Sequence, residues 1–326
     1  MKIRPRVRLG IVVACLAPGM LVAQLPAVAQ TFPSQQVTIV VPFAPGGLTD
    51  GIARVMAAKL GDKWKQTVLV DNRPGGGTIV GTQAVVKSPP DGHTLLLTSF
   101  GFTINQILVK NLPYDSRALT PLNMACIAPN VLYVHSSVPA ATVGELIALA
   151  KAQPGKLTFA SSGNASSPHM AAELFASVTA TDIVHVPYKG TGPAMADLLG
   201  GQVTGIFDTM QSMQYVKAGK LKALAIATKK RLPAAPDLPT FAEGGLPAME
   251  VASWFGYFVP AKTPAAVRGR LYDDIQEVLS TPEIQSKIAA LGAEPNLMSQ
   301  AEFARFLDSE RERWAKVIRE RNIKLD

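Results

Sequence analysis

Short apolar runs alternate with helical patterns along most of the chain. Val37–Val41 is a continuous apolar run typical of a buried strand, and Ile52–Leu60 repeats its apolar residues on one helical face. Continuous apolar strands that alternate with helices indicate parallel sheets covered on both faces. The same pattern predicts further strands at 67–70, 94–97, 131–134, 157–160, 183–186, 203–207 and 223–227, and further helices at 143–152, 170–177, 194–199 and 211–218.

The last third of the chain is mostly helical, and its helix starts are well marked. Thr263-Pro264 and Thr281-Pro282 each place a capping hydroxyl before a proline, which suits the first position of a helix. Ser299 and Glu302 have the spacing of a capping box. We therefore expect helices to begin at these three points.

The chain has 326 residues, of which 48% are hydrophobic and 17% charged. This composition is globular, and the length suits one large domain or two of ordinary size. The sequence contains no repeat at solenoid periods and no low-complexity linker. With so many short βα units, two α/β lobes with a cleft between them are the natural arrangement.

The first 29 residues have the pattern of a secretory signal peptide. Lys2, Arg4, Arg6 and Arg8 precede an apolar stretch, and a small-x-small cleavage site ends at Ala29. A membrane anchor is the alternative, but the apolar stretch is short and is broken by a Pro-Gly pair. The residues before Cys15 also resemble a lipoprotein processing site, after an apolar stretch too short to be preferred. We expect cleavage near Ala29 and export of the mature chain.

Charge and cysteine content narrow the function further. The formal net charge of +8 falls to +4 when the four basic residues of the signal peptide are removed. No dense Lys/Arg patch is interleaved with aromatic residues, so nucleic acid is not an expected partner. Cys126 is then the one remaining cysteine, which excludes an internal disulfide and a cysteine-rich metal site. It is expected to be a small buried hydrophobe.

A glycine-rich loop follows the first strand. It runs from Pro42 to Asp50 and contains the pair Gly46-Gly47 just before a helix. Glycines let backbone N–H groups approach a ligand, and a helix start adds free N–H donors and the positive end of the helix dipole. The loop is not a P-loop, because no Gly-Lys-Ser/Thr follows. It is either an anion site or a tight turn with Thr49 or Asp50 as the helix cap.

A serine-rich loop, 160–169, follows a later strand in the same way. Its hydroxyl and N–H groups suit a carboxylate, and Ser167-Pro168 starts the next helix. The alternative is a surface loop with a good helix cap. His169 lies in the first helical turn, where it could orient the loop, contact the ligand or be exposed.

Two more strand ends carry polar residues. Arg73, in the loop 71–77, could pair with a carboxylate or form part of a solvated turn. Asp208 follows a strand and could accept from a ligand hydroxyl or amine, hold a water, or cap the next helix. Neither pattern decides between binding and structure.

Enzyme signatures are missing from the sequence. It has no Gly-x-Ser-x-Gly, no His-Glu-x-x-His and no Gly-x-Gly-x-x-Gly. Its four histidines lack the spacing of metal ligands. The residues therefore give little support to an enzyme, although sequence alone cannot exclude a Ser-His-Asp group assembled in space.

From about Phe32 to Asp326 the chain resembles the tripartite tricarboxylate transporter receptors, the Bug-type extracytoplasmic solute receptors. Many motifs occur in the family's order, which makes the resemblance highly specific. They include residues 37–47, 71–75, 90–92, 112–115, 154–157, 184–190, 198–203 and 254–256.

The resemblance implies an α/β fold of the periplasmic binding protein type, a type II Venus-flytrap with two lobes and a ligand cleft between them. Residues 31–128 with 254–326 would form lobe one, and 129–253 lobe two. The family implies a receptor that captures a small organic carboxylate and delivers it to a membrane transporter with one large and one small subunit. The resemblance also implies no catalysis and no metal, and we expect a periplasmic monomer without a cofactor. A ligand sensor for a membrane signalling receptor is the alternative.

In the family, backbone and hydroxyl groups of the glycine-rich and serine-rich loops hold the ligand carboxylate. Carried over to this chain, the resemblance implies ligand contacts at Ala44, Gly46, Gly47, Thr49, Asp50, Ser161, Ser162, Ser166, Tyr188 and Asp208. To these we add Phe43, Ser99 and His169 of the same loops and strand ends as expected contacts.

One loop departs from the family pattern. Phe100-Gly101-Phe102-Thr103 replaces a smaller and more polar loop. If Phe100 or Phe102 faces the cleft, the pocket becomes more apolar. This predicts a ligand with an apolar or aromatic portion beside its carboxylate.

Overall fold

The structure is a computed structural model that describes Met1 and residues 32–324. The signal peptide predicted at 1–29 and its alternatives concern residues that lie, apart from Met1, outside this range. Among the residues that the structure describes, none of the helices has both the length and the hydropathy that spanning a lipid bilayer requires. The chain from Phe32 onward forms one compact unit.

The first sheet has six strands in the order β11-β4-β10-β3-β1-β2. Strand β1 pairs in parallel with β2 and β3, whereas β10 is antiparallel to β3 and β4, and β11 is antiparallel to β4. The sheet is therefore mixed. Its strands are β1 (Val37–Val41), β2 (Val68–Asn72), β3 (Thr94–Ser99), β4 (Leu119–Pro129), β10 (Ala252–Pro260) and β11 (Glu294–Pro295).

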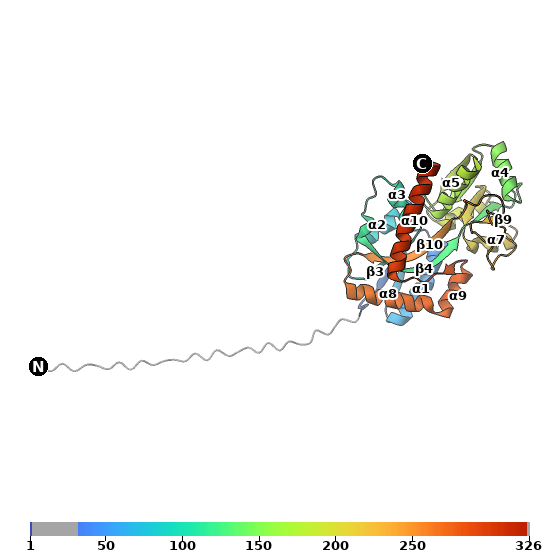
Figure 1. The fold of residues 1–326 in the computed structure, drawn as a ribbon. Coiled ribbons are helices and arrows are strands. Elements are labelled where there is room, and N and C mark those ends of the chain that lie inside the picture. The colour runs from blue at the N-terminus through green and yellow to red at the C-terminus, as the bar shows by residue number, and fades with distance from the viewer. Residues whose placement is uncertain (2–31, 325–326) are drawn as a thin grey trace. The chain divides into compact units, whose positions relative to one another are not determined.

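Helices from both ends of the chain pack with this sheet. The long last helix, red in Figure 1, runs beside α3 and packs on β4, while α8 packs on the same strand and contacts α1. These helices are α1 (Leu48–Trp64), α2 (Ile79–Val86), α3 (Gly101–Leu108), α8 (Ala265–Ser280), α9 (Pro282–Ala290) and α10 (Gln300–Arg321), with a short 3-10 turn η1 (Ser116–Ala118) before β4.

The second sheet has five strands in the order β7-β6-β8-β5-β9. Strand β6 is parallel to β7 and β8, and β5 is antiparallel to β8 and β9. Its strands are β5 (Val131–His135), β6 (Leu157–Ser161), β7 (Ile183–Pro187), β8 (Gly205–Asp208) and β9 (Leu221–Ile226).

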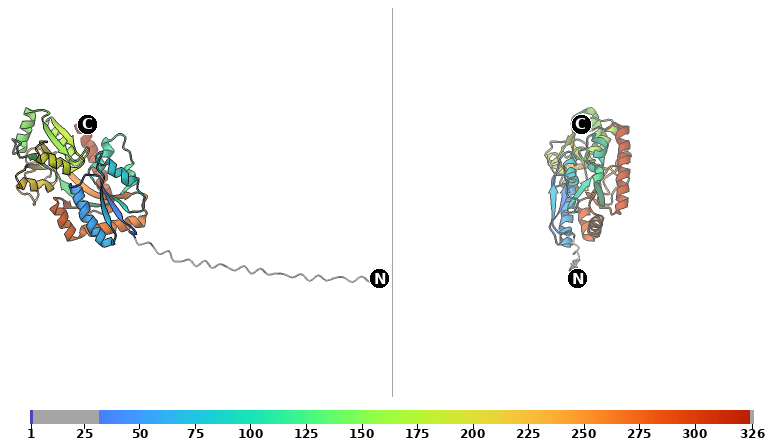
Figure 2. Two further views of the ribbon diagram at one scale, coloured as in Figure 1. Left: turned by 180° about the vertical axis from the view of Figure 1, so that it is seen from behind. Right: turned by 90° about the vertical axis from the view of Figure 1, so that its left-hand side faces the viewer.

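The second sheet has its own helices. Helix α5 packs on β6 and β8, α6 on β5 and β6, and α7 on β9. Figure 2 shows the second sheet with its helices, in green and yellow, beside the larger first group in its left-hand view. The helices are α4 (Val143–Ala152), α5 (Ser167–Thr179), α6 (Thr191–Leu199), the 3-10 turn η2 (Met210–Ser212) and α7 (Met213–Lys217).

The prediction of parallel sheets is wrong in one respect. Each sheet has a parallel part, but the strands β4, β5 and β10 that carry the chain between the sheets run antiparallel to their neighbours. Strands β4 and β10 and helices α2 and α3 were not predicted. The strands and helices that were predicted between residues 37 and 227 are present, with ends shifted by a few residues.

The chain passes between the sheets at two adjacent points. Asn130 joins β4 to β5, and the return segment enters β10 after Val251. The backbone N–H of Asn130 donates to the carbonyl of Val251 (3.0 Å), and the carbonyl of Asn130 accepts from Ala227 (2.8 Å). These bonds hold the two crossings side by side.

Aromatic side chains fill much of the core. Trp254, Phe258 and Trp314 are buried, and Phe100 packs edge-on against Trp314 with the ring centroids 5.0 Å apart. Cys126 is completely buried and has no disulfide partner among the described residues, so its prediction as a small buried hydrophobe is confirmed.

Candidate functional site

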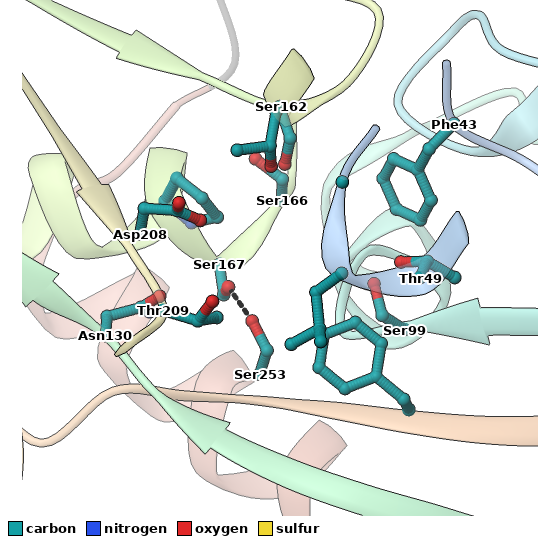
Figure 3. A pocket seen from close by; sticks show the side chains of 15 residues that line it. Phe43, Thr49, Ser99, Asn130, Ser162, Ser166, Ser167, Asp208, Thr209 and Ser253 are labelled. Carbon is teal, nitrogen blue, oxygen red and sulfur yellow. Dashed lines mark hydrogen bonds between the residues drawn. The ribbon is translucent and has the colours of Figure 1, made fainter. Parts of the chain in front are cut away.

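A small polar cavity lies between the two sheets. Its walls come from both groups of elements: Figure 3 shows Phe43, Thr49 and Ser99 facing Ser162 and Asp208. The cavity encloses about 30 Å³. Its lining residues are Phe43, Gly47, Leu48, Thr49, Ser99, Asn130, Ser162, Ser166, Ser167, Pro168, Thr191, Asp208, Thr209, Ser253 and Phe255.

Three helices begin at this cavity. Gly47 is the N-cap of α1, Ser166 that of α5, and Thr191 is the first residue of α6. Gly47 and Gly190, the N-cap of α6, supply no capping side chain, so the first N–H groups of α1 and α6 are free of such a partner. Three positive helix ends and several hydroxyl groups form a site for an anion. Among the described residues that line it, none is Lys or Arg.

The carboxylate of Asp50 holds the glycine-rich loop in shape. It accepts from the N–H of Gly46 (3.1 Å), from Asn72 (3.0 Å) and from Arg54 (3.0 Å). Burial alone would raise the pKa of Asp50, but the hydrogen bonds from Arg54, Gly46 and Asn72 outweigh it and lower the pKa. Asn72 also donates to the carbonyl of Phe43 (3.1 Å). Asp50 thus lies behind the loop and positions it.

Two stacked histidines hold the serine-rich loop. The rings of His169 and His185 lie 3.8 Å apart between centroids, with 14° between their planes. His169 Nδ1 accepts from the N–H of Ala165 (3.1 Å), and His185 Nε2 is 2.6 Å from Ser161 Oγ, which accepts from Gly163. Burial, with a smaller effect of His169, lowers the pKa of His185 to about 3. His169 therefore orients the loop instead of lining the cavity.

Asp208 is the one charged side chain among the described residues that line the cavity. Its side chain is buried, and burial raises its pKa to about 6. The hydroxyl of Ser212 (2.5 Å) and the N–H of Thr209 donate to its carboxylate and limit this rise. The alternative role, a cap of the following helix, falls instead to Thr209, which is the N-cap of η2.

The structure brings about half of the predicted residues to the cavity. The others lie in the same loops or just behind them, and Gly46 lines a neighbouring cavity. Those at the cavity are Phe43, Gly47, Thr49, Ser99, Ser162, Ser166 and Asp208; those outside its lining are Ala44, Gly46, Asp50, Ser161, His169 and Tyr188. Tyr188 donates its hydroxyl to Asp197 (2.6 Å), and burial, followed by Asp197, raises its pKa to about 12.

Several lining residues were not predicted. Asn130 and Ser253 lie where the chain crosses between the sheets, and no motif marks these positions. Asn130 is completely buried, and neither polar atom of its side chain has a hydrogen-bond partner among the described residues; the same holds for Thr209 Oγ1. Ser253 shares a short hydrogen bond with Ser167 (Figure 3). Buried polar groups without partners indicate that a ligand or water completes the site.

Two sequence hypotheses do not fit the cavity. Arg73 pairs with Asp71 (2.7 Å) in its own loop and does not line the cavity. Phe100 and Phe102 are buried in the core, with Phe102 packed against Phe258 at 4.8 Å between centroids. Neither ring therefore lines the cavity, and these two residues do not favour an apolar ligand.

The described part of the chain contains no group of three or more His, Cys, Asp and Glu side chains that could hold a metal ion. The cavity instead offers hydroxyl, amide and backbone donors, which suit an organic anion.

The fold and the cavity together indicate a class of protein. Two sheets with a polar cavity between them, and three helices that begin at that cavity, are the architecture expected of a two-lobed solute-binding protein.

Comparison with known proteins places the chain within one family of that class. Residues 52–323 match the tripartite tricarboxylate transporter family receptor, TctC. The chain is 37% identical to BugT of Bordetella pertussis over 304 residues, which cover 92% of this chain and 93% of BugT. The chain belongs to this receptor family, as its motifs predicted.

Solved structures agree with this assignment. The periplasmic binding protein BugD superposes with a TM-score of 0.86 at 32% identity, covering 90% of this chain and 99% of BugD. Rpa4515 of R. palustris, solved with adipate, also gives a TM-score of 0.86, at 35% identity and with 90% and 99% of the two chains covered. The predicted two-lobed periplasmic binding fold is confirmed, and the protein is a solute-binding receptor of the TctC/Bug type.

Proposed function

We propose that this receptor binds a small organic carboxylate in the cavity between its lobes and delivers it to a tripartite membrane transporter. The observation that carries the proposal is the convergence of three helix N-termini on a cavity whose described lining contains no Lys or Arg. Backbone dipoles and hydroxyl groups bind an anion without a fixed ion pair. The adipate bound to Rpa4515 supports a carboxylate as the ligand.

We further propose the arrangement in which this binding takes place. The mature chain begins after Ala29 in the periplasm and acts as a monomer, with lobe one formed by 31–128 and 254–326 and lobe two by 129–253. A large and a small membrane subunit receive the ligand. Among the thirteen predicted residues, those at the cavity contact the ligand, and Ala44, Gly46, Asp50, Ser161, His169 and Tyr188 shape the loops that do.

Calorimetric titration of the mature chain, residues 30–326, tests the binding step. Acetate, hexanoate, succinate, adipate, citrate and benzoate sample the class, and hexanol and hexylamine serve as uncharged and cationic controls. We expect at least one carboxylate to bind with a Kd in the micromolar range or below and neither control to bind. Binding of the amine in place of every acid would contradict the proposal.

The glycine-rich loop offers a sharper test. A valine at Gly47 would project into the cavity from the N-cap of α1, whereas a single Cβ there would meet Thr191 at an ordinary 3.5 Å. Gly47→Val should weaken carboxylate binding at least roughly tenfold, because it blocks approach to the helix end. Gly47→Ala is the matched control and should lose much less. Equal affinity of the valine variant and the natural protein would refute the role of the loop.

A further inference from the structure

A second cavity adjoins the first. It encloses about 190 Å³ and shares Thr191 and Asp208 with the first cavity, and Gly46 on its wall directly precedes Gly47 of the other. Helix α6 supplies one side, and η2 with α7 supplies the other. Its lining residues are Gly46, Thr191, Gly192, Met195, Ala196, Leu199, Asp208, Gln211, Ser212, Gln214 and Tyr215.

The two cavities differ in size, and the smaller one has room for only part of a ligand. A water needs about 10–15 Å³ of such space, so the first cavity, at about 30 Å³, admits two or so groups of that size. A carboxylate with its two oxygens has this size. The rest of a larger ligand must extend elsewhere, and the second cavity, with about six times the space, shares Thr191 and Asp208 with the first.

The chemistry of the second cavity suits an uncharged group. Met195 and Leu199 of α6 and Tyr215 of α7 give it an apolar and aromatic wall, and the two glutamines are neutral. Among its described lining residues none is Lys or Arg, while Asp208 lines both cavities. A second carboxylate here would lose its hydration beside an acid and gain no cationic partner, which is unfavourable.

We propose that the second cavity is a subsite for an uncharged apolar or aromatic tail, so that the preferred ligand is a monocarboxylate with such a tail. The proposal rests on the proposed function, since the carboxylate must occupy the first cavity. It assigns selectivity to Met195, Leu199 and Tyr215, and it replaces the earlier argument from Phe100 and Phe102, which lie in the core.

Matched acids test this assignment by calorimetry on the mature chain at one pH. Propanoate, butanoate and hexanoate form a tail series, 3-phenylpropanoate supplies an aromatic tail, and adipate is hexanoate with a second carboxylate. Affinity should rise roughly threefold to fourfold for each added methylene, and hexanoate should bind at least roughly tenfold tighter than adipate. Adipate binding as tightly as hexanoate would overturn the subsite while leaving the proposed function intact. If no acid binds, the proposed function itself fails.

Two variants at exposed positions locate the tail. Ala196→Trp fills the cavity from α6 and should weaken hexanoate at least roughly tenfold while changing propanoate less than roughly twofold. Ala289→Trp, at an exposed position on α9, is the matched control and should change neither. Equal losses for both acids, or no loss for either, would place the tail elsewhere.

Gln214→Arg adds a cation to the wall and keeps the proposal testable if the tryptophan variant does not fold. Gln214 is exposed, so an arginine there is compatible with folding. The substitution should shift the preference toward adipate, raising adipate affinity relative to hexanoate by at least roughly tenfold. An unchanged ratio of the two affinities would contradict the assignment.

Discussion

Asp208 places a carboxyl group at a site that is proposed to bind an anion. Its carboxyl lies in a cavity formed by positive helix ends, yet burial raises its pKa to about 6 from an ordinary 3.8. Because the folded protein holds this proton more tightly than the unfolded chain, Asp208 favours folding below about pH 3.8. That contribution is lost as the pH rises through about 6. An anion bound nearby should raise the pKa further and be taken up together with a proton.

Substitution of Asp208 by Asn should remove this pH dependence. The rise of the Asp208 pKa from 3.8 to about 6 corresponds to about 3 kcal/mol, so between pH 4 and pH 8 the natural protein should lose up to that amount of stability relative to Asp208→Asn. Urea denaturation of the ligand-free proteins across this range measures the difference. Parallel curves for the two proteins would show that the Asp208 pKa is not raised.

Some residues that line the cavity could be predicted from the sequence, and others could not. Gly47 and Ser166 could be predicted, because a glycine-rich or serine-rich loop between a strand and a helix presents N–H groups to an anion, and this loop is visible in the sequence. Asn130 and Ser253 could not, since each is an ordinary polar residue that becomes part of the site only when the two crossings meet. Asp50 and His169 belong to the correct loops, but their hydrogen bonds turn them away from the cavity.

At the scale of elements, two Thr-Pro pairs have different outcomes. Thr281 caps α9 as predicted: its hydroxyl accepts from the N–H of Ile284 (3.4 Å). The capping box of Ser299 and Glu302 is also confirmed. The prediction for Thr263 is wrong, because α8 begins one residue later with Pro264 as its N-cap, and Thr263 Oγ1 has no hydrogen-bond partner among the described residues.

Because only one of the two threonines caps a helix, replacement by valine should have different effects at the two positions. Thr281→Val removes a cap and should lower the free energy of unfolding by about 1 kcal/mol. Thr263→Val replaces a buried hydroxyl without a partner by a methyl group of the same shape, so it should be neutral or slightly stabilising. Denaturation with urea compares the two. A larger loss at Thr263 than at Thr281 would contradict this account of the caps.

The local pattern of apolar residues predicted most strands but not whether each strand runs parallel or antiparallel to its neighbours. The apolar run of β1 predicts a buried strand correctly, and its parallel neighbours follow from the βα alternation. Strand β10 lies far along the chain and pairs antiparallel between β3 and β4. Its direction depends on where the chain returns from the second sheet, which is a property of the tertiary structure.

At the scale of the whole molecule, the lobes meet through backbone. The N–H of Ala44 donates to the carbonyl of Lys189 (2.8 Å), which joins the loop after β1 to the loop after β7. A Cβ added at Gly77 would overlap the carbonyl oxygen of Asn164 in the other lobe. Neither Ala44 nor Gly77 lines the ligand cavity. The two backbones approach this closely at Gly77 because no side chain lies between them.

A methyl group at Gly77 should therefore favour the open receptor. If both lobes hold the ligand, as proposed above, Gly77→Ala should weaken carboxylate binding at least roughly tenfold without touching the ligand. Gly76→Ala is a matched control. The φ of Gly76 is +56° and that of Gly77 is +58°, so alanine should cause a similar backbone strain at either position. A Cβ at Gly76 would meet Ile79 of its own lobe at 3.3 Å, so closure should be unaffected. With saturating ligand, small-angle scattering should show a smaller radius of gyration for the control than for Gly77→Ala; equal radii and equal affinities would show that Gly77 does not limit closure.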